Sequence, residues 1–124
     1  MNHREKFNNY NKSIFNLLLN TDDKLFKKSI NLIKKTNKQK GKVYIVGNGG
    51  SSSIASHVSV DFAKVARVNS STFNNANLIT CFANDYGYEN WVVEAIKAYL
   101  NKNDMMILIS SSGASKNIVN AAKY

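Results

Sequence analysis

The chain contains two short polar segments whose residue types suit the binding of a phosphate group. The first segment, residues 47–53, is rich in glycine and serine, and its candidate ligand-binding residues are Asn48, Gly49, Gly50 and Ser51. Glycine lets the backbone approach an anion closely, and the free N–H groups at the start of a following helix favour a phosphate. A tight turn without a ligand would use the same residues, so this segment alone leaves both interpretations open.

The second segment, residues 110–115, supplies four hydroxyl groups, from Ser110, Ser111, Ser112 and Ser115. Hydroxyls beside the exposed N–H groups of a helix start can form most of a phosphate cradle without any cation. For Ser115 alone, capping of the next helix explains the residue equally well. Two such segments predict a phosphate site more strongly than either one does.

Better-known phosphate loops fit the first segment poorly. The nucleoside triphosphate loop ends in Gly-Lys-Ser/Thr, and no lysine occurs between Gly47 and Asp61. The dinucleotide fingerprint finds two of its three glycines, in Gly47 and Gly49, but the acidic residue expected near residues 67–71 is missing. The sequence therefore disfavours both nucleotide classes.

The pattern around the two segments predicts an α/β fold, a three-layer sandwich with a parallel sheet. Short apolar runs predict strands at residues 43–46, 78–82 and 105–109. Apolar residues three or four apart predict helices at residues 51–65, at residues 91–99 and after residue 115, with a loop at residues 83–87. Alternating strands and helices give a parallel sheet, whose consecutive strands deliver both polar segments to one edge.

The N-terminal part predicts two helices within residues 10–38, separated by the N-cap residues Thr21, Asp22 and Asp23. The net charge of +9 attracts anions in general. Many lysines fall in residues 24–42, without the arginines and interleaved aromatic rings that read bases, so we expect a solvated helix face and no nucleic-acid partner.

No apolar run approaches the roughly 20 residues that cross a bilayer, and the first ten residues are polar. We therefore expect a cytoplasmic protein without a membrane partner. The single cysteine, Cys81, cannot form an internal disulfide, and in the strand predicted at residues 78–82 we expect it to be buried and unreactive.

Three segments, residues 46–51, 84–90 and 109–117, resemble in order and spacing the successive motifs of the phosphoheptose isomerases, which have a SIS domain. The resemblance covers nearly the whole chain. It implies a flavodoxin-like SIS domain at residues 41–124, incomplete at its C-terminus, after an N-terminal helical arm at residues 1–40. Family members continue through further strands to a helix that carries a glutamine and a histidine of the site.

The resemblance also implies residue roles. The four serines would hold the sugar phosphate, Asn48 to Ser51 would face the same substrate, and Asp85 would contact sugar hydroxyls, although an Asx turn at Asp85 is equally compatible. His57 and Asp61 match a histidine and a glutamate that serve as acid/base or help to bind zinc in some members. Asp is one methylene shorter than Glu, which leaves both catalysis and zinc as expectations.

The implied activity is the aldose–ketose isomerisation of sedoheptulose 7-phosphate to a heptose 7-phosphate for surface polysaccharide, in a homo-oligomer, by resemblance a tetramer. Such a reaction needs a group that removes a proton beside the carbonyl and a group that returns it. The alternative is a non-catalytic module that binds a phosphosugar or another protein. The missing C-terminal histidine suggests either a fragment of a longer product or this binding-only form.

Overall fold

The computed structural model describes residues 2–124, which form two compact units, residues up to Leu32 and residues Ile33–Tyr124. The elements, in chain order, are α1 (His3–Leu19), α2 (Asp23–Lys38), β1 (Val43–Gly47), α3 (Gly50–Lys64), β2 (Ser70–Thr72), α4 (Ala76–Tyr86), α5 (Trp91–Tyr99), β3 (Met105–Ile109) and α6 (Lys116–Lys123). The second unit holds the whole sheet and both polar segments.

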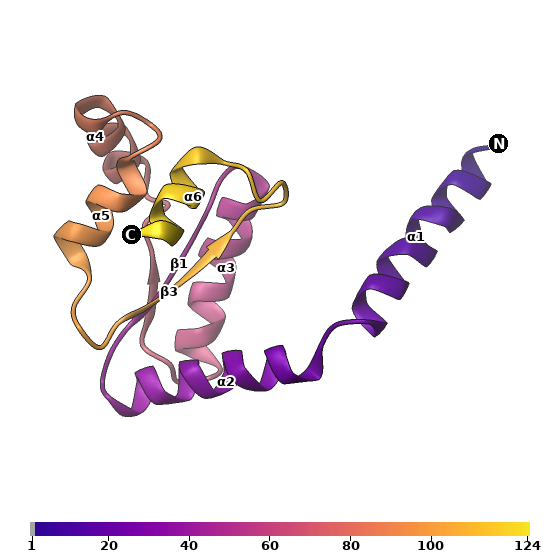
Figure 1. Ribbon diagram of the computed structural model, residues 1–124, viewed down its shortest axis with the longest axis horizontal. Coiled ribbons are helices and arrows are strands. Elements are labelled where there is room, and N and C mark those ends of the chain that lie inside the picture. Colours follow the sequence, from indigo (N-terminus) through magenta and orange to yellow (C-terminus); the bar gives the residue numbers. More distant parts are fainter. Residues whose placement is uncertain (1) are drawn as a thin grey trace. The chain divides into compact units, whose positions relative to one another are not determined.

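The sheet has three parallel strands in the order β2-β1-β3. Val43 of β1 pairs with Ser70 on one side and with Met105 on the other. Because β1 and β3 are neighbours and run in the same direction, the segments that follow them leave the sheet at the same end (Figure 1). The structure confirms the predicted parallel sheet and the predicted meeting of the two polar segments at one edge.

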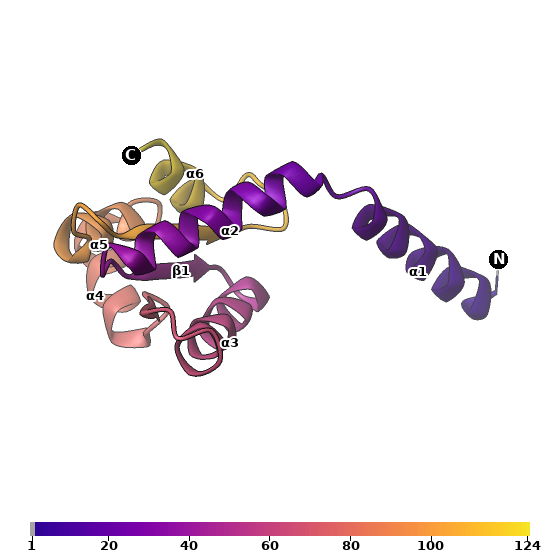
Figure 2. The ribbon, with the colours of Figure 1, turned by 90° about the horizontal axis from the view of Figure 1, so that it is seen from below.

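Alternate side chains of β1 contribute to two separate apolar layers, as the two-residue period of a strand requires. Val43 and Ile45 pack in the cluster that contains Ala55 of α3. Tyr44 and Val46 pack in the cluster that contains Trp91 of α5, with residues of α6. Figure 2 shows α3 and α6 on opposite sides of β1, which confirms the three-layer arrangement.

The prediction of a strand at residues 78–82 is wrong, because these residues lie in α4. The side chain of Asn75 caps this helix by accepting hydrogen bonds from the N–H groups of Asn77 and Leu78. Residues 78, 79, 82 and 83 then pack together against the core, at the spacing of one helical face. The loop predicted at residues 83–87 is likewise helical up to Tyr86.

The second strand is β2, only three residues long, in a polar stretch that gave no strand signal. It pairs on one side with β1, and the hydroxyl of Ser70 donates to the carbonyl of Ser59 in α3. A short polar strand at the edge of a sheet carries little of the apolar pattern from which strands are predicted.

The expectation of a buried Cys81 is also wrong, because this residue is exposed on α4. The error follows from the misassigned strand. In a strand of a parallel sheet both faces are covered, whereas on a helix at the protein surface residues 80 and 81 face away from the core.

The N-terminal unit contains α1 and the first part of α2. Both helices were predicted, but α1 begins earlier than the apolar pattern suggested. Asn2 and Glu5 form a capping box, in which each side chain accepts from the other residue's N–H at 2.9 Å. No side chain of α1 is buried. Within residues 2–124, no helix is both long and apolar enough to span a bilayer.

Candidate functional site

The segment after β1, which we call the glycine loop (residues 47–51), presents open backbone to solvent. Gly49 has a φ of 53° and is the N-cap residue of α3. A Cβ atom at Gly49 or Gly50 would meet nothing within 4 Å. Among the described residues, the N–H groups of Gly49 and Gly50 have no hydrogen-bond partner. The loop therefore offers two free donors on an unobstructed surface at the start of a helix.

Gly47 needs to be glycine for a different reason. A Cβ atom there would lie 2.6 Å from the backbone of Ser51, which is closer than atoms can approach. The side chain of Asn74 accepts from the N–H of Gly47 at 3.1 Å and donates to its carbonyl at 2.7 Å. This amide continues the pairing of β1 beyond the end of β2, and it fixes the start of the loop.

The segment after β3, which we call the serine loop (residues 110–115), uses some of its hydroxyls internally. Ser110 accepts from the N–H of Gly113 at 3.1 Å and lies 3.4 Å from the hydroxyl of Ser115. Ser112 accepts from the N–H of Ala114 at 3.2 Å. Within the described part of the chain, the Ser111 hydroxyl has no partner, and Ser115 makes no capping bond to α6. A hydroxyl that accepts a bond keeps its own O–H, so Ser112 can still donate, but its position is tied to the loop backbone. Ser111 and Ser115 accept no bond from that backbone, so we take them as the leading donors to a ligand.

The two loops are joined directly by side-chain amides. Asn48 of the glycine loop and Asn117 of α6 exchange two hydrogen bonds, both of 2.9 Å. The hydroxyl of Tyr88 donates to the Oδ1 atom of Asn48 at 3.3 Å. Beside this cluster lies a cavity of about 300 Å³, lined by Asn48, Tyr88, Glu89, Ser115, Lys116 and Asn117.

Of these six lining residues, Asn48 and Ser115 were predicted from the sequence, and the other four were not. Tyr88 and Glu89 lie inside the recognised segment 84–90, and Lys116 and Asn117 lie inside segment 109–117. The spans of the motifs thus contained them, but no residue type or spacing singled them out. Ser51 is in the first turn of α3, where its N–H is already bonded to the carbonyl of Asn48 at 3.0 Å.

Asp85 does not line this cavity. It lies in the last turn of α4, exposed, and accepts a hydrogen bond of 2.9 Å from the side chain of Asn84. The Asx turn considered for this residue is not formed at a strand end, because the preceding element is a helix.

His57 and Asp61 lie on one face of α3, with the Nε2 atom of His57 3.2 Å from the Oδ2 atom of Asp61. Their side chains are 79% and 52% exposed. A structural zinc site has four protein ligands, and a catalytic zinc site has three protein ligands and a water molecule or substrate in the fourth position. Among residues 2–124, no group of three or more His, Cys, Asp or Glu side chains could hold a metal, so the residues of this chain alone do not fit the zinc ion.

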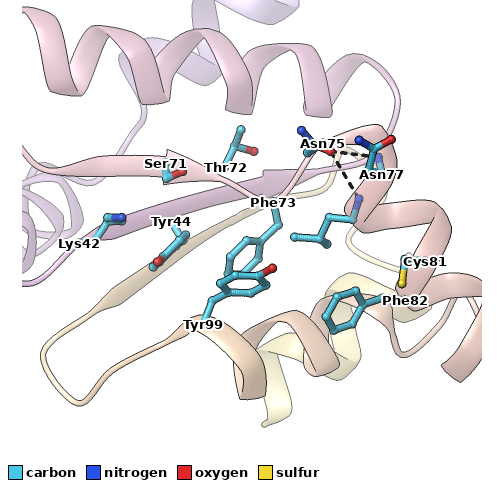
Figure 3. Close-up of a pocket in the computed structure, with 11 residues that line it drawn as sticks. Lys42, Tyr44, Ser71, Thr72, Phe73, Asn75, Asn77, Cys81, Phe82 and Tyr99 are labelled. Carbon is cyan, nitrogen blue, oxygen red and sulfur yellow. Dashed lines mark hydrogen bonds between the residues drawn. The ribbon is translucent and has the colours of Figure 1, made fainter.

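A larger cavity, of about 590 Å³, lies along the β2 edge of the sheet (Figure 3). Its wall includes the rings of Tyr44, Phe73 and Tyr99, with successive ring centroids 4.6 and 5.7 Å apart. Its one cationic side chain, Lys42, lies over the Tyr44 ring at 5.5 Å. We nevertheless place the candidate site at the two loops, despite the smaller cavity there. They follow the carboxyl ends of adjacent parallel strands, where ligands of open α/β sheets bind.

The fold and the site together define a three-layer α/β domain whose candidate ligand site lies at the carboxyl ends of adjacent parallel strands. The chain belongs to the SIS domain family, whose sequence profile matches residues 6–124. A phosphoheptose isomerase of Helicobacter pylori strain P12 is 38% identical over 103 residues, which cover 78% of this chain and 54% of that protein. Phosphoheptose isomerase 2 of Campylobacter jejuni is 35% identical over 98 residues, 73% of this chain and 48% of that protein.

Solved structures agree with the fold. A phosphoheptose isomerase from Neisseria gonorrhoeae superposes with a TM-score of 0.71 at 26% identity, over 77% of this chain and 52% of that one. One from Francisella tularensis reaches a TM-score of 0.87 over 99% of this chain and 69% of that one, at 23% identity. The chain thus spans about half the length of the curated relatives that it matches.

Proposed function

We propose that this chain is the sugar-phosphate-binding part of an aldose–ketose isomerase that interconverts sedoheptulose 7-phosphate and a heptose 7-phosphate. The observation that carries the proposal is the pair of hydrogen bonds between Asn48 and Asn117, which places the glycine loop beside the start of α6. The matching relatives are named phosphoheptose isomerases, which supports an isomerisation of a phosphorylated heptose. The ketose substrate, sedoheptulose 7-phosphate, follows from the motif resemblance. The aldose product would serve the synthesis of surface polysaccharide, and the substrate class would place the enzyme in the cytoplasm.

In this proposal the phosphate lies between the two loops. The N–H groups of Gly49 and Gly50 would donate from one side, and the hydroxyls of Ser111 and Ser115 from the other. Ser110 and Ser112 would shape the serine loop through their internal hydrogen bonds. Lys116, in the cavity wall, would add a positive charge that strengthens these bonds to a dianion.

The remaining predicted residues would contact the sugar hydroxyls or transfer protons during the isomerisation. Ser51 and Asp85 would contact sugar hydroxyls. Isomerisation through an enediol requires a base at the carbon beside the carbonyl, for which Asp61 is the candidate, with His57 sharing its proton. Both side chains are exposed here, so we propose that a homo-oligomer, tetrameric by the family resemblance, covers them and excludes water.

A phosphorus NMR time course of the purified chain with sedoheptulose 7-phosphate, with and without zinc, tests this proposal. New sugar-phosphate resonances that depend on intact Asp61 would support the isomerase. Line broadening without a product would support phosphosugar binding and contradict catalysis by this chain. A spectrum unchanged by the protein would contradict both.

The second candidate is a non-catalytic module that binds a phosphosugar or another protein. The observation that favours it is the position of His57 and Asp61, which are exposed and do not line the cavity beside Asn48. Such a module would broaden the substrate resonances equally in the wild-type chain and in an Asp61→Asn variant, and neither would form product.

A further inference from the structure

We infer that Asn117 is a positioning residue that locks the Asn48 side chain, so that the glycine loop meets its ligand through backbone N–H groups rather than through the Asn48 amide. The inference rests on the proposed function for the identity of the ligand. In this role the Asn48 side chain does not contact the substrate but supports the glycine loop, and we call it a strut. Asn117, which the sequence did not single out, holds it in place.

The geometry of the amide pair is reciprocal. The Nδ2 atom of Asn48 donates to the Oδ1 atom of Asn117 at 2.9 Å, and the Nδ2 atom of Asn117 donates back at 2.9 Å. Asn117 is only 2% exposed, so a broken pair would leave a buried amide without its partner. Burial without a partner is costly, which favours a single arrangement of the two side chains.

The hydrogen-bonding capacity of Asn48 is nearly exhausted by protein partners. An asparagine carbonyl oxygen has two lone pairs and its amide nitrogen has two N–H donors. The Oδ1 atom of Asn48 accepts from Asn117 and from the hydroxyl of Tyr88, at 2.9 and 3.3 Å, which uses both lone pairs. One N–H is used by Asn117, so a single donor is left, and the side chain cannot accept a bond from a sugar hydroxyl.

The Asn48–Asn117 pair also connects the two loops that would donate hydrogen bonds to the phosphate. Asn117 lies in the first turn of α6, next to Ser115 and Lys116, while Asn48 precedes the free N–H groups of Gly49 and Gly50. The pair therefore sets the separation between the two donor groups before any ligand arrives. Donors that need no rearrangement lose less free energy when the ligand binds.

Single and double alanine variants of the pair test the inference by calorimetric titration with sedoheptulose 7-phosphate. We expect Asn117→Ala to weaken binding about tenfold, and Asn48→Ala,Asn117→Ala to bind no more weakly than Asn117→Ala alone, because both changes remove one device. Ser59→Ala is the control, since it removes a partly buried hydrogen bond of 2.8 Å to Ser56 elsewhere on α3. Wild-type affinity in a folded Asn117→Ala variant would overturn the inference.

Hydrogen exchange of the ligand-free chain separates this inference from the proposed function. The amides of Ser51 and Ser52 donate to carbonyl groups of the glycine loop and therefore report on its opening. We expect Asn117→Ala to speed their exchange severalfold more than Ser59→Ala does, because the loop loses its strut. Equal exchange in the two variants would contradict the strut even if the sugar phosphate binds. If the wild-type chain does not bind the sugar phosphate, but Asn117→Ala still exchanges faster than Ser59→Ala, only the proposed function is contradicted.

If Asn117→Ala does not fold, a Tyr88→Phe variant tests the same hydrogen-bond network from its other side. Tyr88 is exposed, so losing its hydroxyl leaves the core intact while it frees one lone pair of Asn48. We expect faster exchange at the amides of Ser51 and Ser52, and a loss of affinity of about twofold to fivefold, on the order of one weak hydrogen bond. No change in either measurement would count against the network.

Discussion

Hydroxyl groups within the serine loop differ in how much of their hydrogen-bonding capacity the protein already uses. Ser110 and Ser112 accept bonds from backbone N–H groups of their own loop, whereas the Ser111 hydroxyl has no partner among the described residues. The sequence predicted a phosphate role for every serine, because residue type alone cannot distinguish a shaping hydroxyl from a free one. We now expect their substitutions to differ in effect.

Replacing Ser111 and Ser112 together by alanine should weaken sugar-phosphate binding about tenfold without unfolding the domain. One change removes a free donor and the other loosens the loop, and both side chains are exposed. Calorimetric titration measures the affinity, and thermal denaturation monitors the fold. Ser53→Ala, an exposed serine of α3, is the matched control. Unchanged affinity in the double variant would rule out the serine loop as the cradle.

Gly47 and Gly50 should respond oppositely to alanine. Gly47→Ala should lower the free energy of unfolding by about 2–4 kcal/mol, because its Cβ would collide with the Ser51 backbone. Gly50→Ala should fold at least as stably as the wild type, since its Cβ meets open space at the start of a helix, but should bind the sugar phosphate more weakly. Urea denaturation and titration measure the two effects. A stable Gly47→Ala variant would contradict the close approach.

Elements were predictable where the apolar pattern and the burial agreed. Strands β1 and β3 are buried or half-buried runs, and α5 and α6 carry clear helical stripes, so each was found near its true bounds. The pattern failed at α4, whose apolar run of five residues fits a strand as well as a helix. It failed again at β2, where pairing with β1 stabilises a polar strand that has no apolar signal.

For the candidate site, the two loops could be predicted from the sequence, but the contact between them could not. Glycine-rich and serine-rich segments after strands are visible in the sequence, and parallel topology brings them together. The amide pair of Asn48 and Asn117 was not, because it joins side chains 69 positions apart through a contact that only the fold creates.

The corrected assignment of α4 predicts that Cys81 reacts in the folded protein. Its thiol is exposed, so a disulfide reagent such as Ellman's reagent should modify it fully in native buffer. The release of thionitrobenzoate measures the reaction, and a Cys81→Ser variant gives the background. A thiol that reacts only after denaturant is added would contradict the exposed helical face and would favour a buried position.

Helix α1 carries many large apolar side chains that the described residues leave exposed. Phe15, Leu17 and Leu18 are 60%, 74% and 68% exposed. Apolar patches of this kind mark contacts with other chains in soluble proteins. They support the proposed homo-oligomer, in which helices of different copies would cover one another.

We therefore expect the chain to self-associate at micromolar concentration, and Phe15→Glu together with Leu18→Glu to shift it toward the monomer. Burying two carboxylates in an apolar interface without partners is costly. Lys12→Glu is the control, because it changes the net charge by the same two units within the same helix. Light scattering coupled to size exclusion measures the mass. A wild-type chain that remains monomeric, or a control that dissociates equally, would contradict assembly through α1.

The site proposed for the sugar phosphate lies between the glycine loop and the serine loop. Titration of ¹⁵N-labelled protein with sedoheptulose 7-phosphate, followed by amide chemical shifts, tests it most directly. We expect the largest shifts at Gly49, Gly50, Ser111 and Ser115, with the residues of the β2 edge unchanged. Shifts concentrated at Ser71, Phe73 and Cys81 would place the ligand in the cavity along the β2 edge instead. Either that result or the absence of any shift would contradict binding at the two loops.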